Sequence, residues 1–149
     1  MTAGDLFFST QGRIPRSGYW GATVVLVIVG VLAMLVLWGI FGRVGLILTP
    51  GGRFAQFVVT MMLVYPAYCI AAKRFQDHEY SGSLAMVGIG VTVLKAMLDW
   101  FHVTGDPWVP NGLDTLFMVV QVGIGIWYFI VLGCLRGTEG KNQYGPAPI

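Results

Sequence analysis

Four long hydrophobic runs, separated by short polar stretches, occupy residues 19–41, 54–72, 83–103 and 114–135. Each run is close to the length of about 20 apolar residues that an α-helix needs to cross the hydrocarbon core of a bilayer. Because a backbone surrounded by lipid must satisfy its own hydrogen bonds, such runs predict helices. The pattern therefore predicts one all-α domain over residues 1–149, an integral membrane four-helix bundle.

The polar stretches carry signals for turns and helix ends. Residues 49–52, Thr-Pro-Gly-Gly, follow the first run and permit a chain reversal within a predicted loop over residues 42–53. Pro66 lies inside the second run, where it removes a backbone hydrogen bond and can kink the helix. Asp114 is the expected N-cap of the fourth helix. We expect residues 1–18 to form an arm at the membrane interface and residues 136–149 to form a polar tail.

Composition supports a membrane protein and excludes several other classes. Hydrophobic residues make up 56% of the chain and charged residues 11%, with a mean hydropathy of +0.72, whereas soluble proteins carry about a quarter charged residues. A net charge of +2 from scattered basic residues offers no stripe for nucleic acid. Cys69 and Cys134 fall within apolar runs, so we expect two buried free thiols.

The distribution of basic residues predicts the topology. Four crossings put both termini on one side of the membrane, and short cytoplasmic loops are enriched in Lys and Arg. The side of the termini holds six basic residues, Arg13, Arg16, Lys73, Arg74, Arg136 and Lys141, and the other side holds Arg43 and Arg53. The termini and the charged loop at residues 73–82 are therefore predicted to face the cytoplasm.

Three polar blocks occur in a fixed order around the four runs. They are Gly12-Arg13 with Arg16 and Tyr19-Trp20, then Lys73-Arg74 with Asp77 and Ser81-Gly82, then Gly137 with residues 140–146. In this order they resemble the YhaH-like family of small bacterial inner-membrane proteins, catalogued only as a domain of unknown function (number 805). The resemblance covers nearly the whole chain. It implies a four-helix, multi-pass protein of the bacterial inner membrane, and it implies no mechanism.

The second block departs from the pattern of that family. Family members typically show two arginines and then Leu-His-Asp before the Ser-Gly pair. Here Lys73 replaces the first arginine, residues 75–77 read Phe-Gln-Asp, and the histidine follows as His78. A lysine lacks the bidentate fork of an arginine, so the two side chains do not bind in the same way.

The first candidate site is the predicted cytoplasmic cluster. Cationic side chains at the interface attract anionic headgroups, and N–H groups at a helix start bind phosphate. The same residues could instead form an ion-pair network that holds the arm and tail against the loop, and both interpretations stay open. The candidate lipid-binding or partner-binding residues are Arg13, Arg16, Lys73, Arg74, Asp77, Ser81, Gly82, Asn142 and Tyr144.

The second candidate site lies within the membrane. Lys95 and Gln121 fall at similar depths in the third and fourth runs, and Asp99 shares a helical face with Lys95. Gln56 and Thr60 could extend the polar lining. An ionisable residue at this depth marks an ion or proton pathway or a buried pair. The sequence leaves open a pathway through Lys95, Asp99 and Gln121 and a structural pair that holds helices together.

No pattern for catalysis or metal binding emerges. His78 and His102 lie on opposite sides of the predicted membrane, and neither a nucleophile elbow nor a phosphate loop is present. We expect no enzyme activity, no cofactor and no metal. The sequence favours a non-enzymatic scaffold or interaction protein whose cytoplasmic face binds lipid headgroups or a partner. The alternative is a small transporter or channel subunit. Membrane lipids are the expected partners, and a homo-oligomer or a membrane-protein partner is left open.

Overall fold

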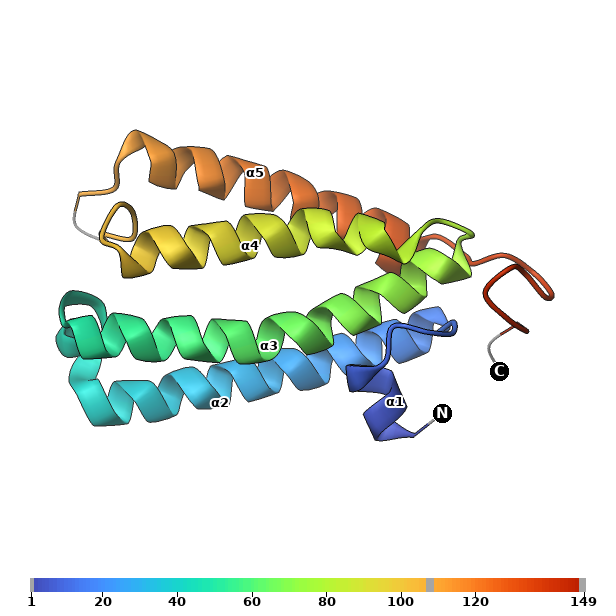
Figure 1. Ribbon diagram of the computed structural model, residues 1–149, viewed down its shortest axis with the longest axis horizontal. Helices are drawn as coiled ribbons and strands as arrows, with labels where there is room; N and C mark the ends of the chain where they lie inside the picture. Colours follow the sequence, from blue (N-terminus) through green and yellow to red (C-terminus); the bar gives the residue numbers. More distant parts are fainter. Residues whose placement is uncertain (1, 107–108, 148–149) are drawn as a thin grey trace.

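The computed structural model describes residues 2–106 and 109–147, most of them helical (Figure 1). No strand forms in these residues, which confirms the all-α prediction. A 3₁₀ turn precedes α4, and a π-helical segment continues α5. The elements are α1 (Ala3–Phe8), α2 (Arg16–Leu48), α3 (Pro50–Asp77), η1 (Gly82–Leu84), α4 (Ala85–Trp100), α5 (Gly112–Tyr128) and η2 (Phe129–Cys134).

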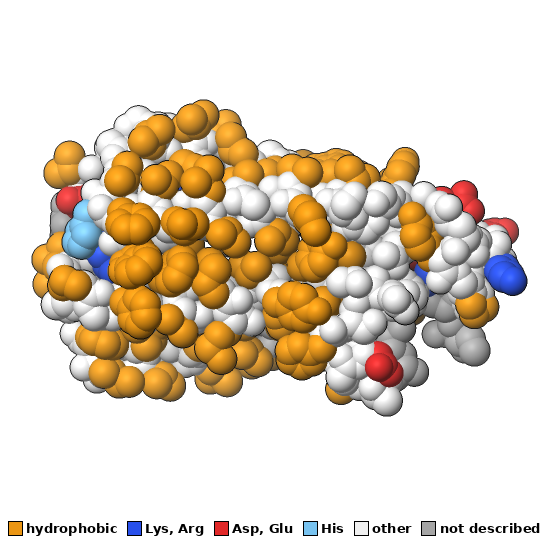
Figure 2. Space-filling model, in the orientation of Figure 1, with side chains coloured by type: hydrophobic (Ala, Val, Ile, Leu, Met, Phe, Trp, Pro, Cys, Tyr) orange, Lys and Arg blue, Asp and Glu red, His pale blue; other side chains and the backbone are white. Residues whose placement is uncertain are grey.

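Four segments are long and apolar enough to cross a membrane, as predicted. They are Arg16–Leu48, Pro50–Asp77, Gly82–Trp100 and Gly112–Cys134. Figure 2 shows hydrophobic side chains spread over the sides of these helices, while the charged side chains lie toward the ends of the molecule. The pattern is that of a bundle whose sides contact hydrocarbon.

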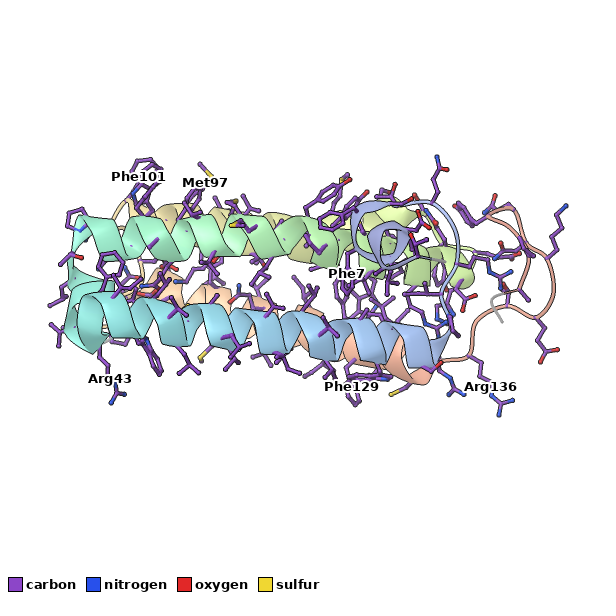
Figure 3. All side chains as sticks on the ribbon, turned by 90° about the horizontal axis from the view of Figure 1, so that it is seen from below. Phe7, Arg43, Met97, Phe101, Phe129 and Arg136 are labelled. Carbon is purple, nitrogen blue, oxygen red and sulfur yellow. The ribbon has the colours of Figure 1, made fainter. Side chains whose placement is uncertain are left out.

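The long helices form two antiparallel pairs, α2 with α3 and α4 with α5 (Figure 1). Because α3 also packs against α4, it joins the two pairs, and η2 packs against α2. Both ends of the chain and the α3–α4 connection lie at one end of the bundle, which we call the terminal end. The other two connections lie at the opposite end. Figure 3 labels Arg136 at the terminal end and Arg43 at the opposite end.

The connection between α2 and α3 is shorter than the predicted loop over residues 42–53. Gly42 leaves the helical conformation, with φ 67° and ψ 166°, but the apolar residues after it return to helix up to Leu48. Thr49 then caps α3, its Oγ1 accepting a hydrogen bond from Gly52 N at 3.0 Å. Pro50 is the first residue of α3, where its fixed φ suits a helix start. Arg53 therefore lies inside α3.

The buried core surrounds the C-terminal half of α3. This half begins at Pro66, which lacks an N–H, and α3 bends along its length (Figure 1). Toward the opposite end the helices expose most of their apolar side chains. Cys69 is a buried free thiol as expected, whereas the free thiol of Cys134 is exposed. The buried hydrophobic residues around this half of α3 are Ile14, Ala22, Cys69, Ile70, Ala71, Ala72, Phe75, Ala85 and Leu132, and Leu46 is buried at the opposite end.

After the end of α3, two backbone N–H groups donate hydrogen bonds back to carbonyls of its last turn, and one residue adopts a left-handed conformation. Tyr80 N donates to Phe75 O at 3.0 Å, and Glu79 N donates to Gln76 O at 3.1 Å. This termination usually places glycine at the left-handed position, but here Glu79 occupies it with a φ of 63°. His102 does the same after α4 with a φ of 60°. A side chain in this conformation costs about 1 kcal/mol.

Replacing Glu79 by glycine should therefore stabilise the protein. For Glu79→Gly we expect a free energy of unfolding about 0.5–1 kcal/mol higher, because glycine adopts a positive φ without a steric penalty. Thermal unfolding in detergent or lipid would measure the change. Glu79→Ala is the control, because it removes the same carboxylate and keeps the β-carbon. An equal gain in both variants would show that charge, and not backbone conformation, is responsible.

Candidate functional site at the terminal end

Asp77, the last residue of α3, binds two arginines at once. Its Oδ1 accepts from Arg13 Nε at 2.9 Å, and its Oδ2 accepts from Arg74 Nη1. The exposed fractions of Arg13, Arg74 and Asp77 are 5%, 1% and 2%. One buried carboxylate thus faces two buried guanidinium groups, and the remaining positive charge has to be stabilised by other acceptors.

Arg74 finds these acceptors at the end of the fourth span. Its Nε donates to Leu132 O at 2.8 Å and its Nη2 donates to Leu135 O at 2.6 Å. Nη1 also reaches Ile14 O of the arm, at 3.3 Å. The last carbonyls of a helix have no partner within the helix, and they carry the negative end of its dipole. Arg74 therefore caps this span and joins it to the arm.

Two side chains of α2 complete the cap. Trp20 Nε1 donates to Gly133 O at 3.2 Å, and Arg16 Nη1 donates to Cys134 O at 3.1 Å. With Arg74 they bind four successive carbonyls, those of residues 132–135. A β-carbon at Gly133 would lie 2.7 Å from the Trp20 ring, so only glycine permits this approach.

Arg13 binds the tail. Its Nη1 donates to Gly140 O at 2.7 Å and to Gly145 O at 3.2 Å. Its Nη2 donates to the carbonyl and hydroxyl oxygens of Thr138, at 2.6 and 3.0 Å. Arg13 therefore connects the arm, α3 through Asp77, and the tail.

The tail also binds directly to the end of α3. The backbone N and the Oγ1 of Thr138 each donate to Asp77 O at 2.9 Å. Asn142 Nδ2 donates to Gln76 O at 3.0 Å, and Tyr144 N donates to Asn142 Oδ1 at 2.9 Å. A β-carbon at Gly137 would overlap the Asp77 carboxylate. Glycine at this position lets the tail lie against the arginine pair.

Lys73 belongs to a separate contact with α1. It is fully buried, and its Nζ donates to the carbonyls of Asp5 and Leu6, the latter at 3.0 Å. Tyr65 Oη donates to Phe8 O at 3.3 Å. These carbonyls form the C-terminal end of α1, which therefore docks onto α3 through its unpaired acceptors.

His78 follows this network directly after the end of α3. Burial lowers the pKa of its imidazole, and the positive charge of Arg74 lowers the pKa further. A charged ring here would add another cation beside two arginines that share one carboxylate. The neutral form avoids that repulsion.

The predicted residues at this end, apart from Arg16, divide into four groups. Arg13, Arg74, Asp77 and Asn142 come together in one network, and Lys73 binds the arm. Ser81 and Gly82 belong to the turn before α4, where Ser81 Oγ accepts from Ser83 N at 3.3 Å. Tyr144 lies in the turn of the tail, outside the arginine pair.

Arg16 borders a groove between arm and tail. The groove has a volume of about 200 Å³ and is lined by Pro15, Arg16, Arg74, Asp77, Arg136, Gly137, Thr138 and Ala147. Arg16 and Arg136 are exposed, and Figure 3 shows Arg136 pointing away from the bundle. Within the described residues Arg136 donates no hydrogen bond, and Arg16 donates one. Both guanidinium groups retain donors for an external anion.

The Lys95 cluster lies toward the opposite end. Lys95 Nζ pairs with Asp99, and it also lies 3.2 Å from Asp114 Oδ1. Gln121 does not join this cluster, because its side chain is exposed on α5. The expectation that Asp114 caps the fourth helix was wrong. Asn111 is the N-cap, and Asp114 completes its capping box, a pattern that the Asn-x-x-Asp spacing would have revealed.

Arg53 is a buried side chain at the opposite end that the sequence did not place in a site. It is 9% exposed, and it donates from Nε to Ile47 O at 2.6 Å and from Nη1 to Asp99 O at 2.8 Å. It thereby caps the last turns of α2 and α4. A cavity of about 120 Å³ adjoins it, lined by Ile47, Arg53, Gln56, Phe57, Thr60, Ala96, Asp99 and Gly105. The Thr49-Pro50 helix-start signal could have placed Arg53 in the helix.

Four membrane-crossing helices, closed at both ends by buried arginines that bind helix carbonyls, define a small polytopic membrane protein. The family described as "Protein of unknown function (DUF805)" matches residues 7–146, and the chain belongs to that family. The match confirms the domain of unknown function that the three polar blocks indicated. No curated protein and no solved structure matches the chain.

Neutralising Asp77 should destabilise the fold strongly. Asp77→Asn leaves Arg13 and Arg74 buried without a counter-charge, and breaking a buried pair in this way costs about 3 kcal/mol. We expect a correspondingly lower free energy of unfolding, measured by denaturant or thermal unfolding in detergent. Glu139→Gln, an exposed carboxylate of the tail, is the charge-matched control and should change little. Equal losses in the two variants would contradict a special role for Asp77.

Proposed function

We propose that this chain is a non-enzymatic scaffold of the bacterial inner membrane whose terminal-end face binds anionic lipid headgroups. The observation that carries the proposal is the groove of about 200 Å³ between arm and tail, at which Arg16 and Arg136 are exposed. Guanidinium groups bind phosphate oxygens in a bidentate manner, and basic clusters beside membrane spans attract anionic lipids. The groove lies beside the end of the fourth span, where headgroups are expected.

The arrangement of donors supports a division between structural and binding arginines. Arg13 and Arg74 are buried and direct their donors to carbonyl oxygens and to Asp77. An external anion would have to displace these bonds. Arg16 and Arg136 keep free donors, so the proposed headgroup contacts fall on them, and Arg74 adds positive charge to the groove lining.

The proposed orientation places the terminal end in the cytoplasm. The six basic residues of the arm, the α3 end and the tail lie at this end, and Arg43 and Arg53 lie at the other. Cytoplasmic ends of membrane proteins carry such an excess of Lys and Arg. The anionic lipids of the cytoplasmic leaflet would then face the groove.

The Lys95 cluster supports a scaffold more than a transporter. A transport pathway needs an ionisable group that faces a continuous polar route, whereas Lys95 pairs directly with Asp99 and Asp114. The adjoining cavity is lined only by residues 47–60 and 96–105, all toward the opposite end. Gln121, the third member of the predicted pathway, is exposed on α5. These contacts favour a structural role for the cluster.

Removing the free arginines should reduce lipid retention. The protein would be purified in native lipids, and the bound phospholipids quantified by mass spectrometry. For Arg136→Gln we expect about fivefold less anionic lipid relative to zwitterionic lipid, because each basic residue near an anionic surface contributes about 1 kcal/mol; Arg16→Gln should add to the loss. Arg43→Gln, an exposed arginine at the opposite end, is the matched control. Unchanged retention in Arg136→Gln, or an equal loss in Arg43→Gln, would contradict headgroup binding.

Reporter fusions test the proposed orientation. With the carboxyl terminus in the cytoplasm, a C-terminal green fluorescent protein should fluoresce, and a C-terminal alkaline phosphatase should be inactive. The same reporters inserted in the α4–α5 connection should show the reverse behaviour, because that connection lies at the opposite end of the bundle (Figure 1). Active phosphatase at the carboxyl terminus would place the groove outside the cytoplasm.

A further inference from the structure

A small polar cavity lies between α3 and α4 at the opposite end of the bundle. Its volume is about 120 Å³. The residues that line it from α3 share one face of that helix, because they recur at spacings of three and four residues. They are Arg53, Gln56, Phe57 and Thr60. Asp99 of α4 and Gly105 of the connection after it also line the cavity.

A cation and an anion line this cavity without pairing with each other. Arg53 is 9% exposed, and its Nη1 donates to the backbone oxygen of Asp99 at 2.8 Å. Within the described residues, however, its guanidinium forms no ion pair with the Asp99 carboxylate, and its Nη2 donates to no acceptor. Asp99 Oδ1 accepts from Lys95 and Thr104, whereas its Oδ2 accepts from none of these residues. The lining therefore retains a free donor of a buried cation and a free acceptor of an anion.

The other polar side chains of the lining offer acceptors. Gln56 Nε2 donates to Leu46 O at 2.8 Å, and its Oε1 accepts from no described residue. Thr60 Oγ1 donates to Gln56 O at 2.9 Å, so its lone pairs can still accept a hydrogen bond. The cavity can therefore accept several hydrogen bonds from a ligand, in addition to donating from Arg53.

The charges around the cavity are balanced. Lys95 pairs with Asp99 and lies 3.2 Å from Asp114 Oδ1. Together with Arg53 they make two cations and two anions. A ligand with a net charge would leave an uncompensated charge beside a buried guanidinium, which is unfavourable where water is scarce. A ligand with one positive and one negative group adds no net charge, and each of its groups can form a charge-assisted hydrogen bond with the lining.

We propose that this cavity binds a small zwitterionic solute, a molecule of about the size of glycine that carries a carboxylate and an ammonium group. The carboxylate would accept from Arg53 Nη2, and the ammonium would donate to Asp99 Oδ2. A volume of about 120 Å³ holds roughly four water molecules, so amino acids with long side chains are excluded. The proposal concerns the opposite end of the bundle and does not depend on headgroup binding.

Equilibrium dialysis with radiolabelled solutes tests the proposal. The full chain in phosphatidylcholine nanodiscs would be dialysed against glycine, acetate or methylammonium, so that the zwitterion is compared with probes that carry only one of its charges. Glycine should bind saturably with a dissociation constant of about 10 µM to 1 mM, a range that a ligand of so few atoms can reach. Acetate and methylammonium should each bind about tenfold more weakly, because each leaves one charged side chain of the cavity without a partner.

Variants of α4 separate binding in the cavity from general damage to the fold. Ala96→Leu fills the cavity and keeps both charged side chains, so it should weaken glycine binding about tenfold. Gly90→Leu is the matched control on the same helix, where an added β-carbon would meet nothing within 4 Å. Asp99→Asn keeps the shape of the side chain and removes the anion. This variant should lose the preference for glycine over acetate, a change in selectivity that loss of folded protein would not produce.

Four results would each overturn the proposal. Absence of saturable glycine binding would mean that the cavity holds water alone. Acetate binding as tight as glycine binding would identify an anion site, and equally tight methylammonium binding would identify a cation site. Equal glycine affinity in Ala96→Leu and Gly90→Leu would place the bound solute elsewhere on the chain.

Discussion

The structure depends on hydrogen bonds from arginines of α3 to carbonyl oxygens at the ends of neighbouring helices. The last carbonyls of a helix have no hydrogen-bond partners within the helix. Where lipid surrounds the helix, water cannot supply those partners. Because α3 runs antiparallel to α2 and α4, its N-terminal end lies beside their C-terminal ends, where Arg53 binds Ile47 O and Asp99 O. At its other end Arg74 binds Leu132 O and Leu135 O. Each cation also meets the negative end of a helix dipole.

This constraint explains why so much charge is buried in a chain with so few charged residues. A guanidinium has five N–H donors in a rigid plane, enough to bind several carbonyls together with a carboxylate. Arg74 uses this capacity on two helix-end carbonyls, the arm and Asp77. Lys73, with a single ammonium, binds only the end of the short α1. The two adjacent basic residues therefore perform different tasks, and exchanging them would leave carbonyls of the fourth span unpaired.

Much of the fold could be predicted from the sequence, because bilayer crossing depends on the length and hydrophobicity of each run. The same reasoning grouped the arm, the α3 end and the tail, since four crossings bring them to one end. The depth of a residue along a helix could be counted from the sequence. The direction in which its side chain points around the helix axis could not. Lys95 and Gln121 were predicted at similar levels, yet Lys95 pairs with Asp99 while Gln121 is exposed. The apolar residues around α5 differ too little to mark which face packs. Arg53 was placed in a loop because residues 49–52 predict a turn, whereas Thr49 caps α3 and Pro50 begins it.

Polar groups that the fold leaves without partners indicate where the chain meets other molecules. Arg13, Lys73 and Arg74 use their donors internally, whereas Arg16, Arg136 and Gln121 retain unused hydrogen-bonding capacity. The proposed headgroup groove is built on the fourth span itself, because α5 continues directly into η2, whose last carbonyls bind Arg16 and Arg74. A headgroup bound by the free donors of Arg16 would therefore lie beside the arginine bonds that close this end of the bundle.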